Sequence, residues 1–131
     1  MAEAFYAEDG FTTPSSELRT NLEQLITSSA ARVAIADASA PIGFAITTTS
    51  FGLENGLIAE LEDLYVHPDH RRRGVATLLI SDSAGWALQG GAKHLEVVIA
   101  PNGLDVSHLH AYYDKLGFRD EGRTLRTRPL G

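Results

Sequence analysis

The chain has 131 residues, which suits one globular domain with a single hydrophobic core, so we expect one domain over residues 1–131. Hydrophobic residues make up 44% of the sequence and charged residues 21%, a balance that excludes a disordered polar chain. No apolar run approaches the length of a membrane span, and the first ten residues lack the apolar stretch of a signal peptide. We therefore expect a cytoplasmic protein without a membrane partner.

The formal net charge of −6 disfavours a nucleic-acid partner that is bound mainly through phosphate contacts. Three of the 11 basic residues nevertheless stand together as Arg71, Arg72 and Arg73, which indicates a local anion site. The acidic remainder suits a cationic acceptor, or it serves solubility alone. The chain has no cysteine, so a disulfide framework, a thiol nucleophile and a thiolate metal site are excluded. His67 and His70 share a proline-containing loop without further ligands, so we expect no metal.

The first half of the chain alternates between helical and extended patterns. Helical composition marks residues 1–10, and apolar residues at helical spacing predict a helix over residues 15–27. Alternating and β-branched segments predict three strands, and a Glu-Asn-Gly sequence before the third strand predicts a tight hairpin turn. These strands form an antiparallel meander and cover residues 32–38, 42–51 and 57–66.

Alternation along the third strand places two carboxylates on one face, with Glu60 and Glu62 beside Leu64 and Val66. The opposite face takes the remaining residues, Leu61, Asp63 and Tyr65. Because a carboxylate on an internal strand needs water or a partner, the pair predicts a polar cleft. The alternatives are a solvated face or ion pairs with arginines elsewhere in the chain.

A polar loop with Pro68 leads from this strand into an apolar run that predicts a helix from Gly74 or Val75 to about Gln89. The three arginines stand just before that helix, and Gly74 and Ala76 carry almost no side-chain bulk. First-turn N–H groups and the helix dipole favour an anion, and guanidinium groups add phosphate donors. We predict a phosphate or pyrophosphate site there; the alternative is a solvated loop in front of an ordinary amphipathic helix.

The last third of the chain begins with a largely apolar strand over residues 94–100. Its position after a strand and a helix predicts parallel pairing with a right-handed crossover. A Pro-Asn-Gly turn ends this strand, and a short helix over residues 108–116 is closed by Gly117. Residues 118–128 are predicted to return as a last strand.

The segment LEDLYVHPDHRRRGVA resembles the acetyl-CoA-binding segment of the GCN5-related N-acetyltransferases, the GNAT superfamily. A second family element, HAYYDKLGF, follows over residues 110–118, and the resemblance covers roughly residues 34–122. It implies an α/β (α+β) fold with a mixed, mostly antiparallel central sheet and helices on both faces. The family has a bulge near the third strand, which would move the alternation by one residue.

One part of the family fold has no counterpart in this sequence. The family's first strand is absent before the predicted helix of residues 1–10. Either the start of the chain is trimmed, or another element covers that sheet edge, such as a second subunit of a homodimer.

The resemblance implies acetyl-CoA as co-substrate, with its pyrophosphate on the loop and helix start and its pantetheine arm along a splayed strand edge. Arg71 and Arg73 are the expected charged contacts. Where many members have asparagine for the pantetheine, this chain has Val106, so that contact is lost or taken by Asn102 or Ser107. Where many members have glycine after the first arginine, this chain has Arg72. The implied cofactor-binding residues are Leu64, Tyr65, Val66, Arg71, Arg72, Arg73, Gly74, Val75, Ala76 and Asn102.

The same resemblance implies an enzyme that moves an acetyl group directly to a primary amine of a small molecule or peptide. An alkylamine with a pKa near 10 is protonated at pH 7 and must lose a proton before it can react. Glu62 occupies the position of the base in several relatives, and Glu60 is the reserve, one pleat earlier. Tyr113 matches the family tyrosine that donates a proton to the leaving thiolate. The alternative function is a non-catalytic acyl-CoA-binding sensor or scaffold.

Overall fold

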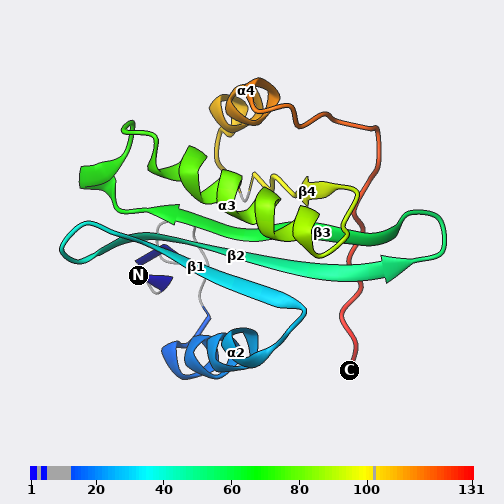
Figure 1. Ribbon diagram of the computed structural model, residues 1–131, viewed down its shortest axis with the longest axis horizontal. Helices are drawn as coiled ribbons and strands as arrows, with labels where there is room; N and C mark the ends of the chain where they lie inside the picture. The colour runs from blue at the N-terminus through cyan, green and yellow to red at the C-terminus, as the bar shows by residue number, and fades with distance from the viewer. Residues whose placement is uncertain (3, 6–12, 102) are drawn as a thin grey trace. The chain divides into compact units, whose positions relative to one another are not determined.

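The computed structural model describes residues 1–2, 4–5, 13–101 and 103–131 (Figure 1). These residues divide into two compact units, Met1–Val98 and Ile99–Gly131. The expectation of a single domain stays a prediction. The helix expected over residues 1–10 lies largely outside the described residues, which include only 1–2 and 4–5 of that range.

The first unit follows the predicted order of elements closely. The predicted helices over 15–27 and from Gly74 or Val75 to Gln89 are confirmed, and the three strands of the meander are confirmed to within one residue at each end. The fourth strand is shorter than the predicted range of 94–100. The observed elements are α2 Ser15–Thr27, β1 Ala31–Asp37, β2 Pro41–Gly52, β3 Gly56–Val66, the 3-10 turn η1 Pro68–His70, α3 Val75–Gln89 and β4 Leu95–Val97.

The four strands form one sheet in the order β1-β2-β3-β4. The first three strands pair antiparallel, and β4 pairs parallel to β3, as the strand, helix, strand sequence predicts. The hairpin turn between β2 and β3 ends at Gly56, whose φ of +67° is accessible to glycine without steric cost. The predicted mixed, mostly antiparallel sheet is therefore confirmed.

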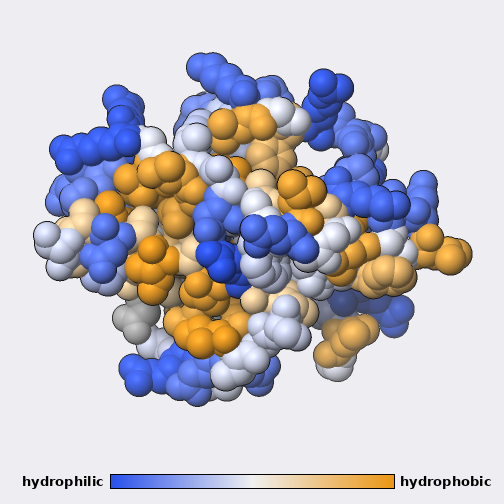
Figure 2. All heavy atoms as spheres, viewed as in Figure 1, coloured by the Kyte–Doolittle hydropathy of each residue, from blue (hydrophilic) through white to orange (hydrophobic). Residues whose placement is uncertain are grey.

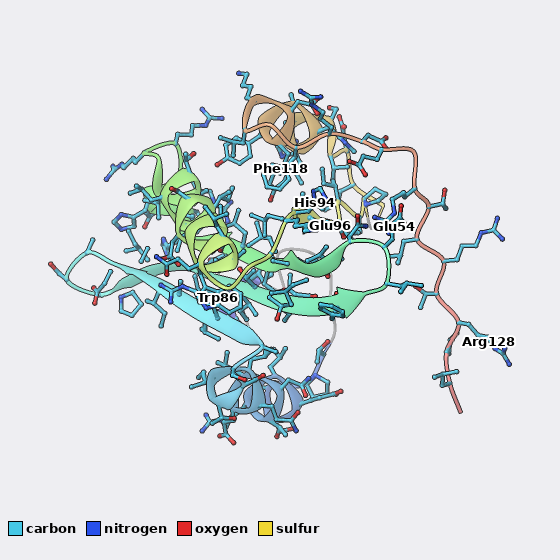
Figure 3. The ribbon with its side chains drawn as sticks, turned by 45° about the vertical axis from the view of Figure 1, so that its right-hand side comes forward. Glu54, Trp86, His94, Glu96, Phe118 and Arg128 are labelled. Atoms are coloured by element: carbon cyan, nitrogen blue, oxygen red, sulfur yellow. The ribbon has the colours of Figure 1, made fainter. Side chains whose placement is uncertain are left out.

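The two faces of the sheet are covered by different helices, α3 on one side and α2 on the other (Figure 1). On the α2 face, the aromatic rings of Phe44 and Tyr65 lie 5.9 Å apart and pack with Ile46 against the α2 leucines. On the α3 face, small residues such as Ala59 and Ala87 bring the helix close to the sheet, and Trp86 covers their edge (Figure 3). Helices on both faces are thus confirmed.

The loop between β3 and α3 has a different character from these packed layers. From His67 to Gly74 all of its residues are exposed except His70, which is half-buried. At the left of the view in Figure 1, where this loop projects, Figure 2 shows strongly hydrophilic side chains at the surface. The loop is therefore the polar edge of the first unit.

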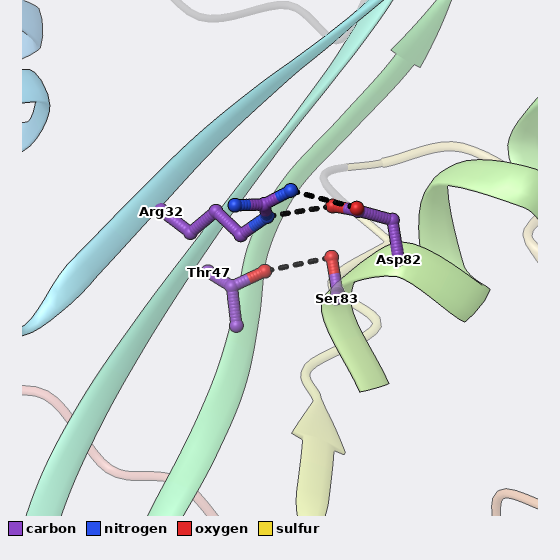
Figure 4. Close-up of polar contacts among 4 residues, drawn as sticks. All are labelled: Arg32, Thr47, Asp82 and Ser83. Atoms are coloured by element: carbon purple, nitrogen blue, oxygen red, sulfur yellow. Dashed lines mark hydrogen bonds and ion pairs between the residues drawn. The ribbon is translucent and has the colours of Figure 1, made fainter. Parts of the chain in front are cut away.

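Two polar contacts fix α3 on the sheet (Figure 4). The hydroxyl of Thr47 in β2 donates a 2.8 Å hydrogen bond to the hydroxyl of Ser83 in α3, and both side chains are buried. Arg32 of β1 donates two 2.7 Å hydrogen bonds to the Asp82 carboxylate, and these bonds hold the pKa of Asp82 below its usual range. The helix position is thus set by specific bonds as well as by apolar contact.

The second unit contains α4, Ser107–Lys115, and its end is a Schellman motif. Gly117, at φ +90°, donates its N–H to the Asp114 carbonyl, and Phe118 donates its N–H to the Tyr113 carbonyl. The Phe118 ring packs edge-on against Tyr113 with centroids 5.4 Å apart. The Leu-Gly-Phe sequence thus both ends the helix and holds the tyrosine ring.

The predicted last strand over residues 118–128 is wrong, because none of these residues is in a strand. The Asp120 carboxylate accepts a 2.8 Å hydrogen bond from the Gly122 N–H, and Gly122 has φ +76°. This local turn competes with strand pairing in a segment rich in charged residues. Among the helices of the described residues, none is long and apolar enough to cross a membrane.

Candidate active site

A bulge in β3 decides which side chains share a face. Ile46 of β2 is the partner of Asp63, and the next β2 residue, Thr47, is the partner of Leu61, so Glu62 is an extra residue in β3. Beyond the bulge the alternation is reversed. The predicted faces are therefore wrong after Glu62: Leu64 and Val66 lie on the α3 face, and Asp63 and Tyr65 lie on the α2 face.

The predicted pairing of the two carboxylates holds in spite of the bulge. Glu60 is half-buried, Glu62 is exposed, and the two side chains are hydrogen-bonded to each other when Glu60 is protonated. Thr48, the partner of Glu60 across the β2–β3 ladder, donates a 2.9 Å hydrogen bond to Glu62 Oε1. The bulge thus turns Glu62 back toward Glu60, and both carboxylates lie on the α2 face.

A third carboxylate adjoins this pair from the neighbouring strand. Glu96 of β4 is the partner of Glu60 in the parallel ladder, and Figure 3 labels it on that strand. The hydrogen bond with Glu62, desolvation, and the negative charges of Glu62 and Glu96 together raise the pKa of Glu60 to about 7. Glu60 therefore exchanges a proton in the neutral pH range, which ordinary carboxylates do not.

The start of α3 is open to an anion. The residue before the helix, Gly74, has φ +82°, and as a glycine it has no side chain with which to cap the first turn. A Cβ placed on Gly74 would meet nothing within 4 Å, so its backbone is freely approached. The first helical bond runs from Leu78 N–H to the Gly74 carbonyl, so the preceding N–H groups lie ahead of the intrahelical ladder.

The same strand that carries the carboxylates ends in an open edge beside this helix start. β4 pairs with β3 only from Ala59 to Leu61, so the remaining β3 residues have β2 as their sole partner strand among the described residues. The His67 N–H donates to the Ile42 carbonyl, which makes Gly43 and Val66 a non-hydrogen-bonded pair. By alternation, the backbone groups of Val66 and Leu64 face the open edge, and those of Tyr65 face β2.

Tyr113 lies in the second unit, on α4. It is 8% exposed, and burial together with the neighbouring Tyr112 raises the pKa of Tyr113 to about 12. The phenol therefore stays protonated at neutral pH, as a proton donor requires. Asn102, the other predicted contact near this unit, lies outside the described residues, and Ser107 is the first residue of α4.

Comparison with known proteins identifies the family. A profile of the acetyltransferase (GNAT) family matches residues 2–118, nearly the whole chain. The chain belongs to the GNAT acetyltransferase family. The predicted membership of the GNAT family is thus confirmed, and the members of this family are N-acetyltransferases.

Three similar proteins extend this comparison. An aminoglycoside N(6')-acetyltransferase type 1 from Acinetobacter haemolyticus is 38% identical over 74 residues, which are 56% of this chain and 49% of that protein. A protein of the same name from Acinetobacter genomosp. 13 is 33% identical over 107 residues, 82% of this chain and 69% of the relative. The solved structure of aminoglycoside N-acetyltransferase AAC(6')-Iy in complex with CoA has a TM-score of 0.78 at 25% identity, covering 88% of this chain and 78% of that one. The matched part of the chain thus spans about half of the first relative and about two thirds of the second.

The residues of this GNAT chain fit the co-substrate that the family implies. A diphosphate needs donors without bulk around them, and the chain offers Gly74, which has no side chain, at the helix start and exposed arginines in the loop before it. An extended amide-bearing arm needs a strand edge without a partner strand, which β3 offers among the described residues at Leu64 and at the N–H of Val66, whose carbonyl accepts from Arg71. These are the residues that would hold acetyl-CoA, whose thioester supplies an activated acyl group.

Three contacts in this GNAT site were not predicted from the sequence. Glu96 adjoins the carboxylate pair, Thr48 orients Glu62, and Arg71 bonds to the β3 backbone. The signal for Glu96 was present, because it is the one acidic residue in the apolar run HLEVVIA that was predicted to pair with β3. The other two contacts depend on the bulge and on loop geometry.

Proposed function

We propose that this GNAT chain transfers an acetyl group from acetyl-CoA directly to a primary amine, with Glu60 as the base. The names of the two Acinetobacter relatives make an aminoglycoside, a polycationic small molecule, the first acceptor class to test. The net charge of −6 suits a cationic acceptor. Peptide amines are the second acceptor class.

The observation that carries the proposal is the position of Glu60 on the strand whose open end adjoins the helix start. At a pKa of about 7, Glu60 is ionised in a large fraction of molecules at neutral pH and accepts a proton more strongly than an ordinary carboxylate. Glu62 is held by Thr48 and accepts a hydrogen bond from protonated Glu60. In this proposal Glu60 takes the proton of the ammonium group, and Glu62 and Glu96 attract the cation.

Tyr113 is the proposed acid. Its phenol is protonated at neutral pH, because burial raises its pKa to about 12. The Schellman motif and the Phe118 ring fix the orientation of its side chain on α4. In this proposal the phenol donates its proton to the leaving sulfur.

The first experiment measures binding and turnover separately. Coenzyme A is titrated in a thermal-shift assay, and acetyl transfer is then measured on aminoglycosides, diamines and peptides. We expect coenzyme A to raise the melting temperature and at least one amine to be acetylated. Glu60→Gln should lower kcat by about 100-fold or more while the coenzyme A affinity is retained.

Glu54→Gln is the matched control, because Glu54 is an exposed carboxylate in the turn of the same β2–β3 hairpin. It should leave turnover unchanged. Stabilisation by coenzyme A without turnover on any amine would favour the non-catalytic acyl-CoA-binding module instead. If Glu60→Gln retained full activity, the base would lie elsewhere.

A further inference from the structure

The three consecutive arginines of the loop have different surroundings. Arg71 Nε donates a 2.8 Å hydrogen bond to the Val66 carbonyl, and the guanidinium carbon lies 5.7 Å from the centroid of the Tyr65 ring. Arg72 and Arg73 are exposed, and within the described part of the chain neither side chain has a hydrogen bond or ion pair. Only Arg71 is thus bonded to the strand that precedes the loop.

Both partners of Arg71 are firmly placed. Tyr65 is 5% exposed and packs against the rings of Phe5 and Phe44 at centroid distances of 5.7 and 5.9 Å. The Val66 carbonyl is on the open edge of β3, because the register with β2 directs it away from that strand. Arg71 therefore connects the first residue after η1 to the last residue of β3, across the turn that separates them.

This connection determines where the phosphate donors lie relative to the strand edge. Arg72 has φ +62°, an unusual value for a residue other than glycine, and Gly74 has φ +82°. Between the end of η1 and the start of α3 the described backbone follows no regular hydrogen-bond ladder, and the bond from Arg71 is a restraint on its course. Removing that bond frees the loop from the β3 edge.

We propose that Arg71 is a positioning residue rather than a phosphate contact, and that Arg72 and Arg73 supply the charge for the diphosphate. The inference rests on the proposed function, since it takes acetyl-CoA as the ligand of the loop. It changes the sequence-based expectation that Arg71 and Arg73 act alike. Arg71 aligns the helix start with the strand edge, so that one ligand can contact both.

The side-chain lengths of glutamine and lysine allow the two roles of Arg71 to be told apart. Glutamine places its amide nitrogen as many bonds from Cα as arginine places Nε, so Arg71→Gln keeps a donor for the Val66 carbonyl and removes the charge. Arg71→Lys keeps the charge but has no donor at that position. A positioning role therefore predicts that glutamine is the better replacement, whereas a phosphate contact predicts that lysine is.

The experiment is a calorimetric titration of coenzyme A into the wild type and the variants at low and moderate salt. We expect Arg71→Gln to bind within about threefold of wild type, with an unchanged salt dependence, and Arg71→Lys to bind at least about tenfold more weakly. The matched control is Arg73, where lysine should be tolerated and glutamine should weaken binding and reduce its salt dependence.

A second measurement tests the anchor without ligand. Amide hydrogen exchange over residues 66–74 should be faster in Arg71→Lys than in the wild type and close to wild type in Arg71→Gln. Better binding by Arg71→Lys than by Arg71→Gln, or equal behaviour of the two in both measurements, overturns the proposal. A wild type that does not bind coenzyme A overturns the proposed function and this inference with it, whereas wild-type binding with the wrong order of variants overturns the inference alone.

Discussion

The two halves of β3 have the same strand conformation but different surroundings. From Gly56 to Leu61 the strand is paired with β2 on one side, and from Ala59 to Leu61 it is also paired with β4 on the other; Ala59 and Leu61 are 0% and 3% exposed. After Glu62 its only partner strand in the described part of the chain is β2, and its other edge carries the backbone groups of Leu64 and Val66. Both halves contribute buried core residues; the first half also carries Glu60, and the second half carries the proposed ligand edge.

One extra residue lies between the two halves. The Glu62 bulge reverses the alternation, so the second half presents Tyr65 to the α2 core and leaves the carboxylates of Glu60 and Glu62 on the same face. A regular strand would have placed apolar residues beside that pair. A single strand thus supplies both the proposed base and the proposed ligand edge. Substitutions in or beside each half test these two roles.

The largest stability effect is expected at Gly43, the β2 partner of Val66 in the second half. A Cβ at Gly43 would lie 2.7 Å from the Tyr65 backbone oxygen, so Gly43→Ala must push β2 and β3 apart. We expect a loss of about 2–3 kcal/mol in the free energy of unfolding and weaker coenzyme A binding, measured by denaturant titration and calorimetry. Gly52→Ala, on the same strand with nothing within 4 Å of its Cβ, is the control and should cost far less.

The next effect is expected beside the first half, at the buried bond of Ser83 with Thr47, which is the β2 partner of Leu61. Thr47→Val keeps the shape but leaves the Ser83 hydroxyl without its partner, which should cost about 1–2 kcal/mol of unfolding free energy. The double variant Thr47→Val with Ser83→Ala should recover part of this loss, because no polar group is then left unpaired. Equal costs for the single and double variants would contradict the assignment.

A smaller effect is expected at the ion pair of Arg32 and Asp82. Both side chains are more than one third exposed, so Asp82→Asn should cost about 1 kcal/mol or less. Because the folded-state pKa of Asp82 lies below its ordinary 3.8, its stabilisation is present above that pH and is lost as the pH falls through the folded-state pKa. Denaturant titrations from pH 7 to pH 2 should show wild type and variant converge in acid.

The smallest effect is expected from a substitution of Glu62, the bulge residue, and it should appear in the pH dependence of the reaction. Glu62→Gln replaces the carboxylate whose hydrogen bond with Glu60 is the largest cause of the raised pKa of Glu60, so the acidic limb of the kcat/KM profile, near pH 7 in the wild type, should move to lower pH. The rate on the alkaline plateau should stay within a few-fold of wild type. A limb that does not move would exclude Glu60 as the titrating group.

Most of the first unit could be predicted from the sequence, because its signals are local. The apolar spacing of α2, the Asn-Gly turn before β3 and the glycine at the start of α3 each act through neighbouring residues. The prediction of a last strand was wrong for the opposite reason: a strand requires a partner strand, and residues 120–122 form a turn instead. The Asp120 carboxylate and the positive φ of Gly122 favour that turn over an extended strand.

The site could be predicted only in part. The carboxylate pair, the arginines and Gly74 are visible in the sequence, but the bulge that redirects Leu64 and Val66 depends on pairing with β2. Which of three adjacent arginines bonds to the strand is a matter of loop geometry, and the sequence treats all three alike. The raised pKa of Glu60 likewise requires knowing that Glu96 lies across the ladder.

The end of α4 has a consequence for changing acceptor preference by engineering. The Schellman motif that ends α4 and the Phe118 ring that packs on Tyr113 both lie within residues 113–118. A graft of this segment into another protein therefore transfers both features. The segments before and after residues 113–118 can be lengthened, shortened or exchanged between relatives, and the contacts that orient Tyr113 are then unchanged. Variation of acceptor range can therefore begin in the connections and leave this helix end untouched.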